Sequence, residues 1–187
     1  SAENLDLYQN EQSPIEVRVH EAILLMQSSN QILVLYATAF ADQKVADSEL
    51  IEMIGSTLRL SATIVQLINE FLPTLDKNDP TYPTRMESLD NVRKNLATVV
   101  IANLKVPTES HLYRTSELKR LLGHMQNTYP VILPALPVAS RAEALQRLRT
   151  LIEDPEMQPL QPELKSLLKA VEKSSKQTET ESARTTN

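Results

Sequence analysis

Two series of hydrophobic positions within residues 15–75 constrain the fold of this chain more than any other feature. The first proceeds in steps of four and three residues: Ile15, Val19, Ala22, Met26, Ser29, Leu33, Tyr36 and Phe40. The second has the same steps: Leu50, Ile54, Thr57, Ser61, Ile64, Ile68, Phe71 and Leu75. Such spacing places side chains on one face of an α-helix and is typical of helices that pack along each other. The sequence therefore predicts two long helices.

The connection between these two helices, residues 44–46, is short enough to form an antiparallel hairpin. Facing positions should then sum to about 90, by the register of an antiparallel pair. This register places large apolar residues opposite each other at both ends of the hairpin. In the middle it places Ser29 opposite Ser61, with Leu33 opposite Thr57.

Residues 22–41 carry no charged side chain, and a helix of that length could cross a bilayer. The five consecutive residues 27–31 are all polar, however, and lipid would leave their side chains poorly satisfied. We therefore expect no membrane span. We expect instead that other helices bury the first helix on much of its circumference.

Composition also indicates helices. The chain has only 2 glycines and no cysteine among 187 residues. Sheet turns and phosphate-binding loops need glycine, so α/β nucleotide-binding folds are disfavoured. The absence of cysteine excludes disulfides, thiolate nucleophiles and thiolate zinc sites.

Four further helices are predicted downstream. Thr84 and Glu87 form a capping-box pattern before a helix that ends near residue 104, and Thr108 can cap a fourth helix that ends near residue 128. Residues 129–138 contain three prolines, so we expect an irregular apolar connector there. Ser140 opens a short helix that ends near residue 153, and Pro162 opens another.

The predicted fold class is all-α: an antiparallel four-helix bundle with a long N-terminal helical hairpin, extended by two short C-terminal helices. Residues 1–12 form a loose lead-in, and residues 13–173 form a single helical-bundle domain. Residues 174–187 lack apolar side chains apart from one alanine and are expected to be a disordered tail.

Charge is distributed unevenly along the chain, whose net charge is −5. Residues 1–79 hold 12 acidic and 4 basic side chains, whereas residues 80–124 hold 4 acidic and 7 basic ones. The first segment is thus acidic and the second basic, which favours pairing between them or two surfaces with different partners. No concentrated basic face exists, so nucleic acid is not an expected partner.

Enzymatic motifs are missing from the sequence. The three histidines, His20, His111 and His124, lack the partners that zinc-protease and di-iron helix motifs require. Gly55 and Gly123 each stand alone within a helical pattern, so no glycine-rich phosphate loop exists. We expect no enzyme, no metal and no cofactor. A site assembled from residues distant in sequence is the remaining enzymatic alternative.

One polar series is a candidate partner-binding face. Tyr113, Glu117, Arg120 and His124 follow steps of four, three and four on the expected fourth helix, with Arg114 beside them. Arginine and tyrosine supply directional donors for an anionic group or a partner carboxylate. The alternative, which is the commoner case, is a solvated helix face with one ion pair.

The small polar residues in the middle of the predicted hairpin form a second candidate site, a pocket for a ligand. Ser29, Thr57 and Ser61 could line a pocket between helices. The alternative is that their hydroxyls bond to carbonyls of their own helices and allow close packing.

These observations favour a non-enzymatic helical module for protein–protein interaction, such as an inhibitor, an immunity-type protein or an assembly factor. The alternative function is a small-molecule- or lipid-binding bundle of the sensor or carrier type. The expected partner is another protein, and pairing of heptad-like helices also allows a homo-oligomer. The composition is that of a soluble protein and is compatible with export after loss of a signal peptide.

Overall fold

The computed structural model describes residues 8–185, and every regular element in this range is helical. The six α-helices are α1 (Ile15–Ala41), α2 (Asp47–Phe71), α3 (Tyr82–Asn103), α4 (Thr115–Ile132), α5 (Val138–Glu153) and α6 (Gln161–Thr185). The short 3₁₀-helices are η2 (Leu72–Thr74), η3 (Val106–Leu112), η4 (Leu133–Ala135) and η5 (Pro155–Leu160). The prediction of an all-α fold is confirmed.

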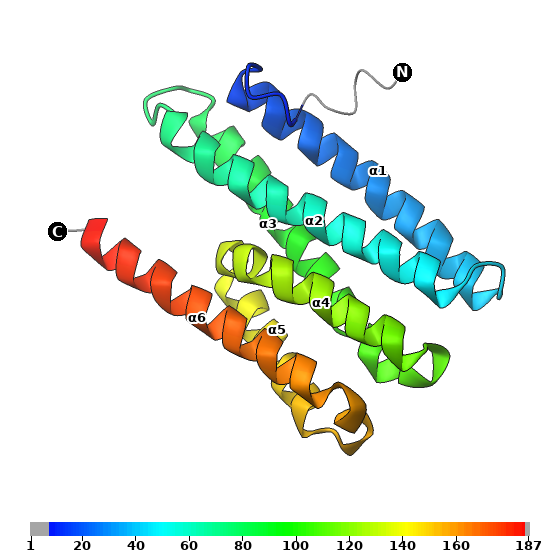
Figure 1. Cartoon of the computed structure of the whole chain (residues 1–187). Coiled ribbons are helices and arrows are strands. Elements are labelled where there is room, and N and C mark those ends of the chain that lie inside the picture. The colour runs from blue at the N-terminus through cyan, green and yellow to red at the C-terminus, as the bar shows by residue number, and fades with distance from the viewer. Residues whose placement is uncertain (1–7, 186–187) are drawn as a thin grey trace.

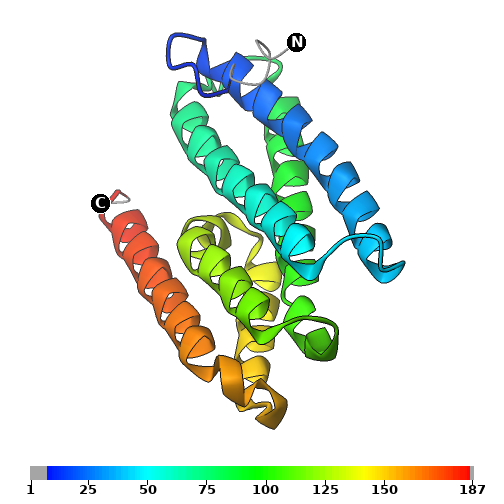
Figure 2. The same ribbon diagram turned by 45° about the vertical axis from the view of Figure 1, so that its right-hand side comes forward.

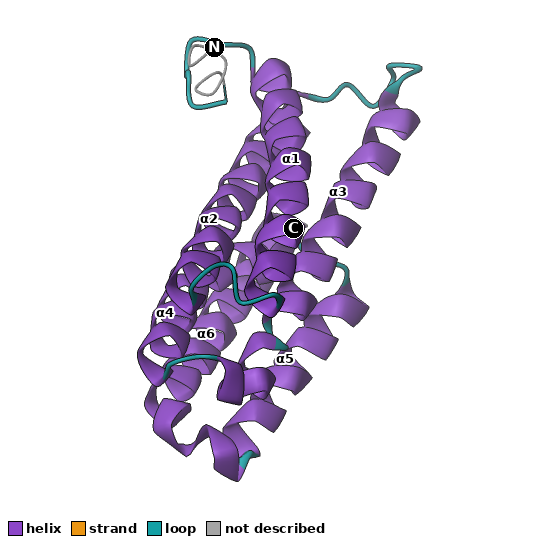
Figure 3. Ribbon diagram, turned by 90° about the vertical axis from the view of Figure 1, so that its right-hand side faces the viewer, coloured by secondary structure: helices purple, strands orange, loops and turns teal. Residues whose placement is uncertain are grey.

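The helices form two layers (Figures 1 and 3). In the first layer α2 packs against α1 and α4, and α4 packs in turn against α6. In the second layer α3 packs mainly against α5, and α5 also contacts α6. The expected bundle of the first four helices is therefore not what these contacts describe, because α4 and not α3 is the second major neighbour of α2. Figure 2 shows α1 at one edge of the molecule and α6 at the other.

The turn between α1 and α2 ends the first helix without glycine. Gln43 adopts a left-handed backbone conformation with φ 58°. Its N–H donates to the carbonyl of Phe40 at 2.9 Å, and the N–H of Lys44 donates to the carbonyl of Ala39 at 2.8 Å. These two bonds satisfy the last carbonyls of α1 in the pattern of a Schellman motif. The backbone N–H of Ala46 then donates to the Glu49 carboxylate at 2.8 Å and starts α2.

The helix starts predicted from capping boxes need correction. No side chain caps α3, which begins at Tyr82 with Pro83 in its first turn. The preceding turn is fixed by Asp79, whose carboxylate accepts the N–H and the hydroxyl of Thr81, both at 2.8 Å. Proline in the first turn needs no N–H partner and so allowed an earlier start than the Thr84 pattern indicated.

The prediction of an irregular connector over residues 129–138 was partly wrong. Helix α4 continues through Pro130 to Ile132, and η4 follows it. Pro130 lies near the end of α4, where the loss of one backbone N–H affects only a single intrahelical bond. The Ser174 hydroxyl donates to the carbonyl of Pro130 and ties this point to α6. Ile132, Leu133 and Leu136 are buried, so this apolar stretch is part of the core.

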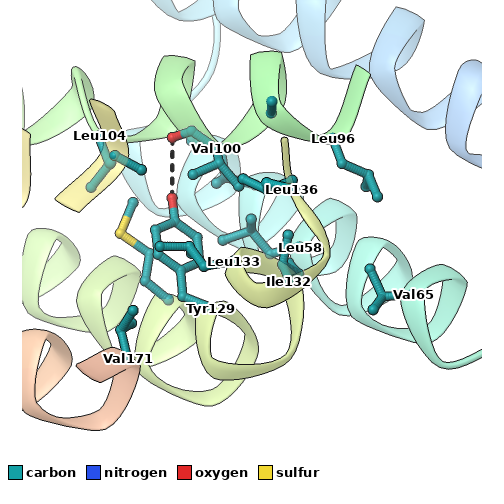
Figure 4. Close-up of a cluster of buried hydrophobic side chains, with 14 of the residues drawn as sticks. Leu58, Val65, Leu96, Val100, Leu104, Tyr129, Ile132, Leu133, Leu136 and Val171 are labelled. Carbon is teal, nitrogen blue, oxygen red and sulfur yellow. Dashed lines mark hydrogen bonds between the residues drawn. The ribbon is translucent and has the colours of Figure 1, made fainter. Parts of the chain in front are cut away.

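The core joins both layers. Tyr129 of α4 is buried, and its hydroxyl donates to the carbonyl of Val100 in α3 at 3.3 Å (Figure 4). Burial raises the pKa of Tyr129 far above its ordinary value, so the hydroxyl remains a donor. The buried side chains labelled around it in Figure 4 are Leu58, Val65, Leu96, Val100, Leu104, Ile132, Leu133, Leu136 and Val171.

At the C-terminal end, α6 continues to Thr185, where the sequence predicted a disordered tail over residues 174–187. The physical reason is that a helix already nucleated by packed residues extends at one hydrogen bond per residue, and this stretch has good helix formers. Residues 186–187 lie outside the described residues, as does most of the predicted lead-in at residues 1–12.

Helix α1 differs most from expectation. Only Val19, Ala22 and Met26 of its 27 residues are buried, so the prediction of burial on much of its circumference was wrong. The sequence pattern identified one packed face of α1, and among the described helices only α2 covers that face substantially. The other sides of α1 face solvent at the edge of the layer.

Candidate interaction surfaces

The five residues of the predicted partner-binding face do not all lie on one helix. Because η3 occupies residues 106–112, α4 begins only at Thr115. Tyr113 and Arg114 therefore precede α4, whereas Glu117, Arg120 and His124 lie on it. The expected helix start at Thr108 was wrong, since its N–H donates to the carbonyl of Lys105 at 2.9 Å within the 3₁₀ turn.

Tyr113 packs against the C-terminal end of α1. Its ring stacks on Phe40 of α1, with ring centroids 4.9 Å apart and an interplanar angle of 21°. Burial is the main cause that raises the pKa of Tyr113, and Glu109 and Asp47 add to it. The ring therefore holds α1 against the segment before α4 and is only half available to a partner.

Arg114 binds the first residue of α2. Its backbone N–H donates to Asp47 at 2.9 Å, and its Nε and Nη2 atoms donate to the same carboxylate at 3.0 and 2.7 Å. The Asp47 side chain is only 11% exposed. The guanidinium of Arg114 lowers the pKa of Asp47 from 3.8 to about 2 against the opposing effect of burial, and backbone N–H groups contribute to the lowering.

This carboxylate gives a prediction for the pH dependence of stability. The pKa of Asp47 in the folded chain, about 2, lies below the value of 3.8 expected after unfolding. The stabilisation is therefore fully present above pH 4 and is lost as the pH falls towards 2. We expect Asp47→Asn to lower the free energy of unfolding by about 1 kcal/mol at neutral pH, after allowance for solvent screening of the exposed guanidinium, and by much less near pH 2.

Urea unfolding at several pH values and low salt measures this difference. Asp90→Asn is the matched control, because Asp90 forms an exposed ion pair with Arg93 at 3.0 Å on a single helix. Such pairs contribute little, so the control should match the wild type within about 0.5 kcal/mol. A deficit of Asp47→Asn that does not change between pH 7 and pH 2 would contradict the electrostatic explanation.

A network of five polar residues, here named the α2–α4 polar seam, comprises Glu52, Arg59, Glu117, Arg120 and His124. Glu52 accepts from Arg59 at 3.1 Å and from Arg120 at 2.9 Å. Arg120 also lies 3.5 Å from Glu117. The hydrogen bond from Arg59 is the main cause that lowers the pKa of Glu52. The seam therefore joins the two helices through charge pairs that lie at the protein surface.

His124 is one of the two most buried residues of the seam, with its side chain 17% exposed against 13% for Glu117. Its Nδ1 atom is 3.4 Å from Arg59 Nη1, and since arginine can only donate, Nδ1 acts as the acceptor. Its Nε2 atom lies 3.7 Å from the Glu52 carboxylate, which is too long for a direct hydrogen bond. Burial is the main cause that lowers the pKa of His124, with Arg59 and Arg120 adding to the effect and Glu52 opposing it. The neutral ring therefore packs against α2 instead of facing a partner.

The predicted partner-binding face thus already has acidic partners within the chain. The Arg114 side chain is 63% exposed and the Arg120 side chain 49%, so each retains a solvent-facing side. Sequence reasoning missed Asp47, Glu52 and Arg59 as their neighbours. One feature of the sequence did indicate them: residues 1–79 have an excess of acidic side chains and residues 80–124 an excess of basic ones. This difference predicted that the two segments pair, but not which residues do so.

The predicted pocket layer contains little free hydrogen-bonding capacity. Thr57 and Ser61 are each 1% exposed. The Thr57 hydroxyl donates to the carbonyl of Met53 at 3.0 Å, and the Ser61 hydroxyl donates to the carbonyl of Thr57 at 2.8 Å. Ser29 is half-buried on α1. These contacts match the packing alternative for this layer, while a ligand role for the three residues stays a prediction.

A surface hollow of about 500 Å³ lies where the connection between α1 and α2 meets η3. Phe40 of α1 and Leu50 of α2 line it from one side, and His111, Leu112 and Tyr113 line it from the other. Leu112 is 49% exposed at its rim. The hollow is largely apolar and continues the surface of α1 around its C-terminal end.

The outer face of α1 is defined here by Leu24, Ser28, Gln31 and Leu35 and by the flanking residues Leu25, Ile32, Val34 and Tyr36. Val34 is 65% exposed, Leu35 67%, Leu24 and Ile32 43% each, and Tyr36 36%. When a helix lies at the edge of a layer, charged and polar side chains usually occupy its solvent-facing side. The outer face of α1 has none between residues 22 and 41.

Comparisons with protein-family models, with curated proteins and with solved structures find no match to this chain.

Within residues 8–185, which the structure describes, two segments are long and apolar enough to cross a membrane, α1 and the continuous segment Asp47–Thr74. They differ in burial: 56% of the most apolar window of Asp47–Thr74 is buried in the structure, against 6% for α1. The second segment is thus mainly a core helix, whereas the apolar character of α1 is not explained by packing within the chain. Among the described residues no group of three or more histidine or acidic side chains could hold a metal ion.

Proposed function

We propose that this chain is a non-enzymatic helical module that binds protein partners through the outer face of α1, as an inhibitor, an immunity-type protein or an assembly factor. The observation that carries the proposal is a helix with no charged side chain between residues 22 and 41, whose apolar side chains Ile32, Val34 and Leu35 face solvent. In this proposal α1 and α2 form an antiparallel hairpin, and α2 attaches the hairpin to α4.

The apolar residues on this face have a clear energetic consequence. Full burial of a leucine, isoleucine or valine side chain contributes about 1.5–3 kcal/mol relative to full exposure. Leu24, Ile32, Val34 and Leu35 keep between 43% and 67% of their surface in water, so a large part of this energy is not realised within the chain. A partner that covers the face would realise it, which is the usual role of a contiguous exposed apolar patch.

The helix is held firmly enough to present the face in a fixed orientation. At its N-terminal end, Glu16 pairs with Arg85 of α3 at 3.2 Å and Arg18 pairs with Glu70 of α2 at 3.5 Å. At its C-terminal end, Phe40 stacks on Tyr113. Both ends of α1 therefore contact the rest of the chain, while the outer face between them is exposed to solvent.

Substitution of two exposed residues tests the proposal. We expect Val34→Glu with Leu35→Glu to fold normally but to lose the proteins that wild type retains in affinity capture from its native source. Val138→Glu is the matched control, because Val138 is 73% exposed at the start of α5. Capture followed by quantitative mass spectrometry provides the measurement, and circular dichroism verifies folding. Retention of the same proteins by all three forms would overturn the proposal.

A further inference from the structure

We infer that the outer face of α1 binds a second copy of this chain, as an antiparallel pair of α1 helices around a two-fold axis between Ser29 and Asn30. The inference rests on the proposed function and names the partner of the same surface. It follows from the geometry of the face, from its residue pattern and from its lack of charge.

The geometry of α1 separates two faces. At 100° per residue, Val19, Ala22 and Met26 point towards α2 and are buried. Leu24, Ser28, Gln31 and Leu35 follow steps of four, three and four and point the opposite way, and Leu24 and Leu35 are among the most exposed large apolar residues described. This spacing is that of a seam between two packed helices, and none of the helices that the structure describes covers it.

The residue pattern of this stretch is nearly palindromic. Residues 24–35 read Leu-Leu-Met-Gln-Ser-Ser-Asn-Gln-Ile-Leu-Val-Leu, so three apolar and two polar positions match on the two sides of the point between Ser29 and Asn30. In an antiparallel pair of identical helices about that point, apolar positions therefore align with apolar ones and polar positions with polar ones, except that Gln27 aligns with Ile32. A two-fold interface requires this kind of self-complementarity.

Pairing with positions that sum to 59 aligns the two seams. Leu24 then meets Leu35 of the second copy, and Ser28 meets Gln31 of the second copy. On one flank, Leu25 lies diagonally across from Ile32 of the second copy, two positions away from this register. Each of these contacts occurs twice because of the two-fold axis. The small Ser28 allows the helices to approach closely at the crossing point, where the Gln31 amide can bond to the serine hydroxyl.

Charge favours this face for self-association. The chain has a net charge of −5, so most pairs of identical surfaces would repel each other. The stretch from residue 22 to residue 41 has no charged side chain and escapes that repulsion. The same stretch fits lipid poorly, because residues 27–31 would place five polar side chains at mid-membrane depth. In the α1 pair these side chains lie at the polar crossing point instead.

The first test is the dependence of mass on concentration. A single helix face is a small interface, so we expect a reversible dimer of two 21.0 kDa chains that dissociates on dilution. Sedimentation equilibrium of the full chain should show Leu35→Glu weakening the dimer by about 100-fold or more, because the two-fold axis introduces two charges into one interface. Val138→Glu should dimerise like wild type.

The second test measures the register. The chain has no cysteine, so single cysteines can be introduced without interference. A mixture of Ser28→Cys and Gln31→Cys chains should form a mixed disulfide under mild oxidation faster than a mixture of Ser28→Cys and Thr38→Cys chains. Equal rates for the two mixtures would overturn the register.

The outcomes separate this inference from the proposed function. A wild-type monomer at all concentrations overturns the inference alone if Val34→Glu with Leu35→Glu still abolishes capture of other proteins. A wild-type monomer overturns both the inference and the proposed function if the variant with Val34→Glu and Leu35→Glu captures the same proteins as wild type. A monomer that instead floats with phosphatidylcholine vesicles also overturns the inference and assigns the face to lipid.

Discussion

Replacing Ile132 with alanine is expected to lower the free energy of unfolding by about 3 kcal/mol. Ile132 is fully buried near the end of α4, and Figure 4 shows it among Leu58, Leu133 and Leu136, from both α2 and the η4 connection. The substitution removes all side-chain carbons beyond Cβ, so the apolar surface buried on folding decreases. It also leaves a cavity that the closely packed neighbouring helices fill only in part.

Ile32→Ala is the matched control for this prediction. The same substitution is made, but Ile32 is 43% exposed on α1. We expect Ile32→Ala to lower the free energy of unfolding by less than about 1 kcal/mol, because a large share of this side chain is in water in both the folded and the unfolded chain. Urea unfolding at low protein concentration measures both variants without a contribution from α1 pairing. Similar losses for the two variants would show that Ile132 does not lie in a packed core.

The sequence predicted the helices well because their apolar spacing and their breaks are local properties. The first hydrophobic series, Ile15 to Phe40, lies within α1, and α5 ends at Glu153 as expected. The predicted start of that helix at Ser140 was wrong, because α5 begins at Val138 directly after Pro137 and no side chain caps it. A helix end was less predictable where a proline favours a break but the residues around it pack in the core. Pro130 suggested a break, but the buried Tyr129 and Ile132 on either side of it keep the last turn of α4 in place.

The arrangement of the helices could not be read from the same pattern. A heptad-like series identifies the face of a helix that packs, but it does not say how many neighbours the helix has. For α1 the series marked the contact with α2 correctly, since Val19, Ala22 and Met26 are buried. Whether the remaining sides were covered depended on where α3 and α4 pack, which is determined by long-range contacts.

The candidate polar face shows the same limit. Glu117, Arg120 and His124 were predicted on one side of a helix, and they do lie on α4. Their immediate partners lie 68 residues (Glu52 to Arg120) and 65 residues (Arg59 to His124) earlier in the chain, and no local spacing links them. Only the opposite charge balance of the two segments indicated that they would pair.

Gly55→Ala is expected to destabilise the chain by about 1–2 kcal/mol, although alanine is the better helix former. Propensity alone would favour alanine within α2 by about 1 kcal/mol. A Cβ atom at this position, however, would lie 2.6 Å from both Cδ2 and Nε2 of the His124 ring, far inside van der Waals contact. Overpacking of this kind costs about 1–3 kcal/mol or more and outweighs the gain in propensity.

The His124 ring cannot easily move away from the new methyl group. It lies between α2 and α4, and its Nδ1 atom interacts with Arg59 at 3.4 Å. A shift of the ring would also separate it from Glu52 and so disturb the α2–α4 polar seam. The close approach of Gly55 to this ring thus explains why glycine is suited to the interior of α2.

Gly123→Ala is the matched control and should raise the stability of the chain, whereas Gly55→Ala should lower it. A Cβ atom at position 123 would meet nothing within 4 Å, so alanine should stabilise α4 by about 0.5–1 kcal/mol. Thermal and urea unfolding of the two single variants should therefore shift the transition in opposite directions. An increase in stability with Gly55→Ala would show that the ring does not contact α2 as described.

A double-mutant cycle assigns the effect of Gly55→Ala to the His124 ring. His124→Ala removes the ring that the new methyl group would strike, so the combined variant should lose less stability than the sum of the two single losses. The expected coupling is about 1–2 kcal/mol, which is typical of residues in direct contact. Additive losses would mean that the cost at Gly55 comes from some other neighbour, whereas coupling of this size would confirm that the ring packs directly against α2.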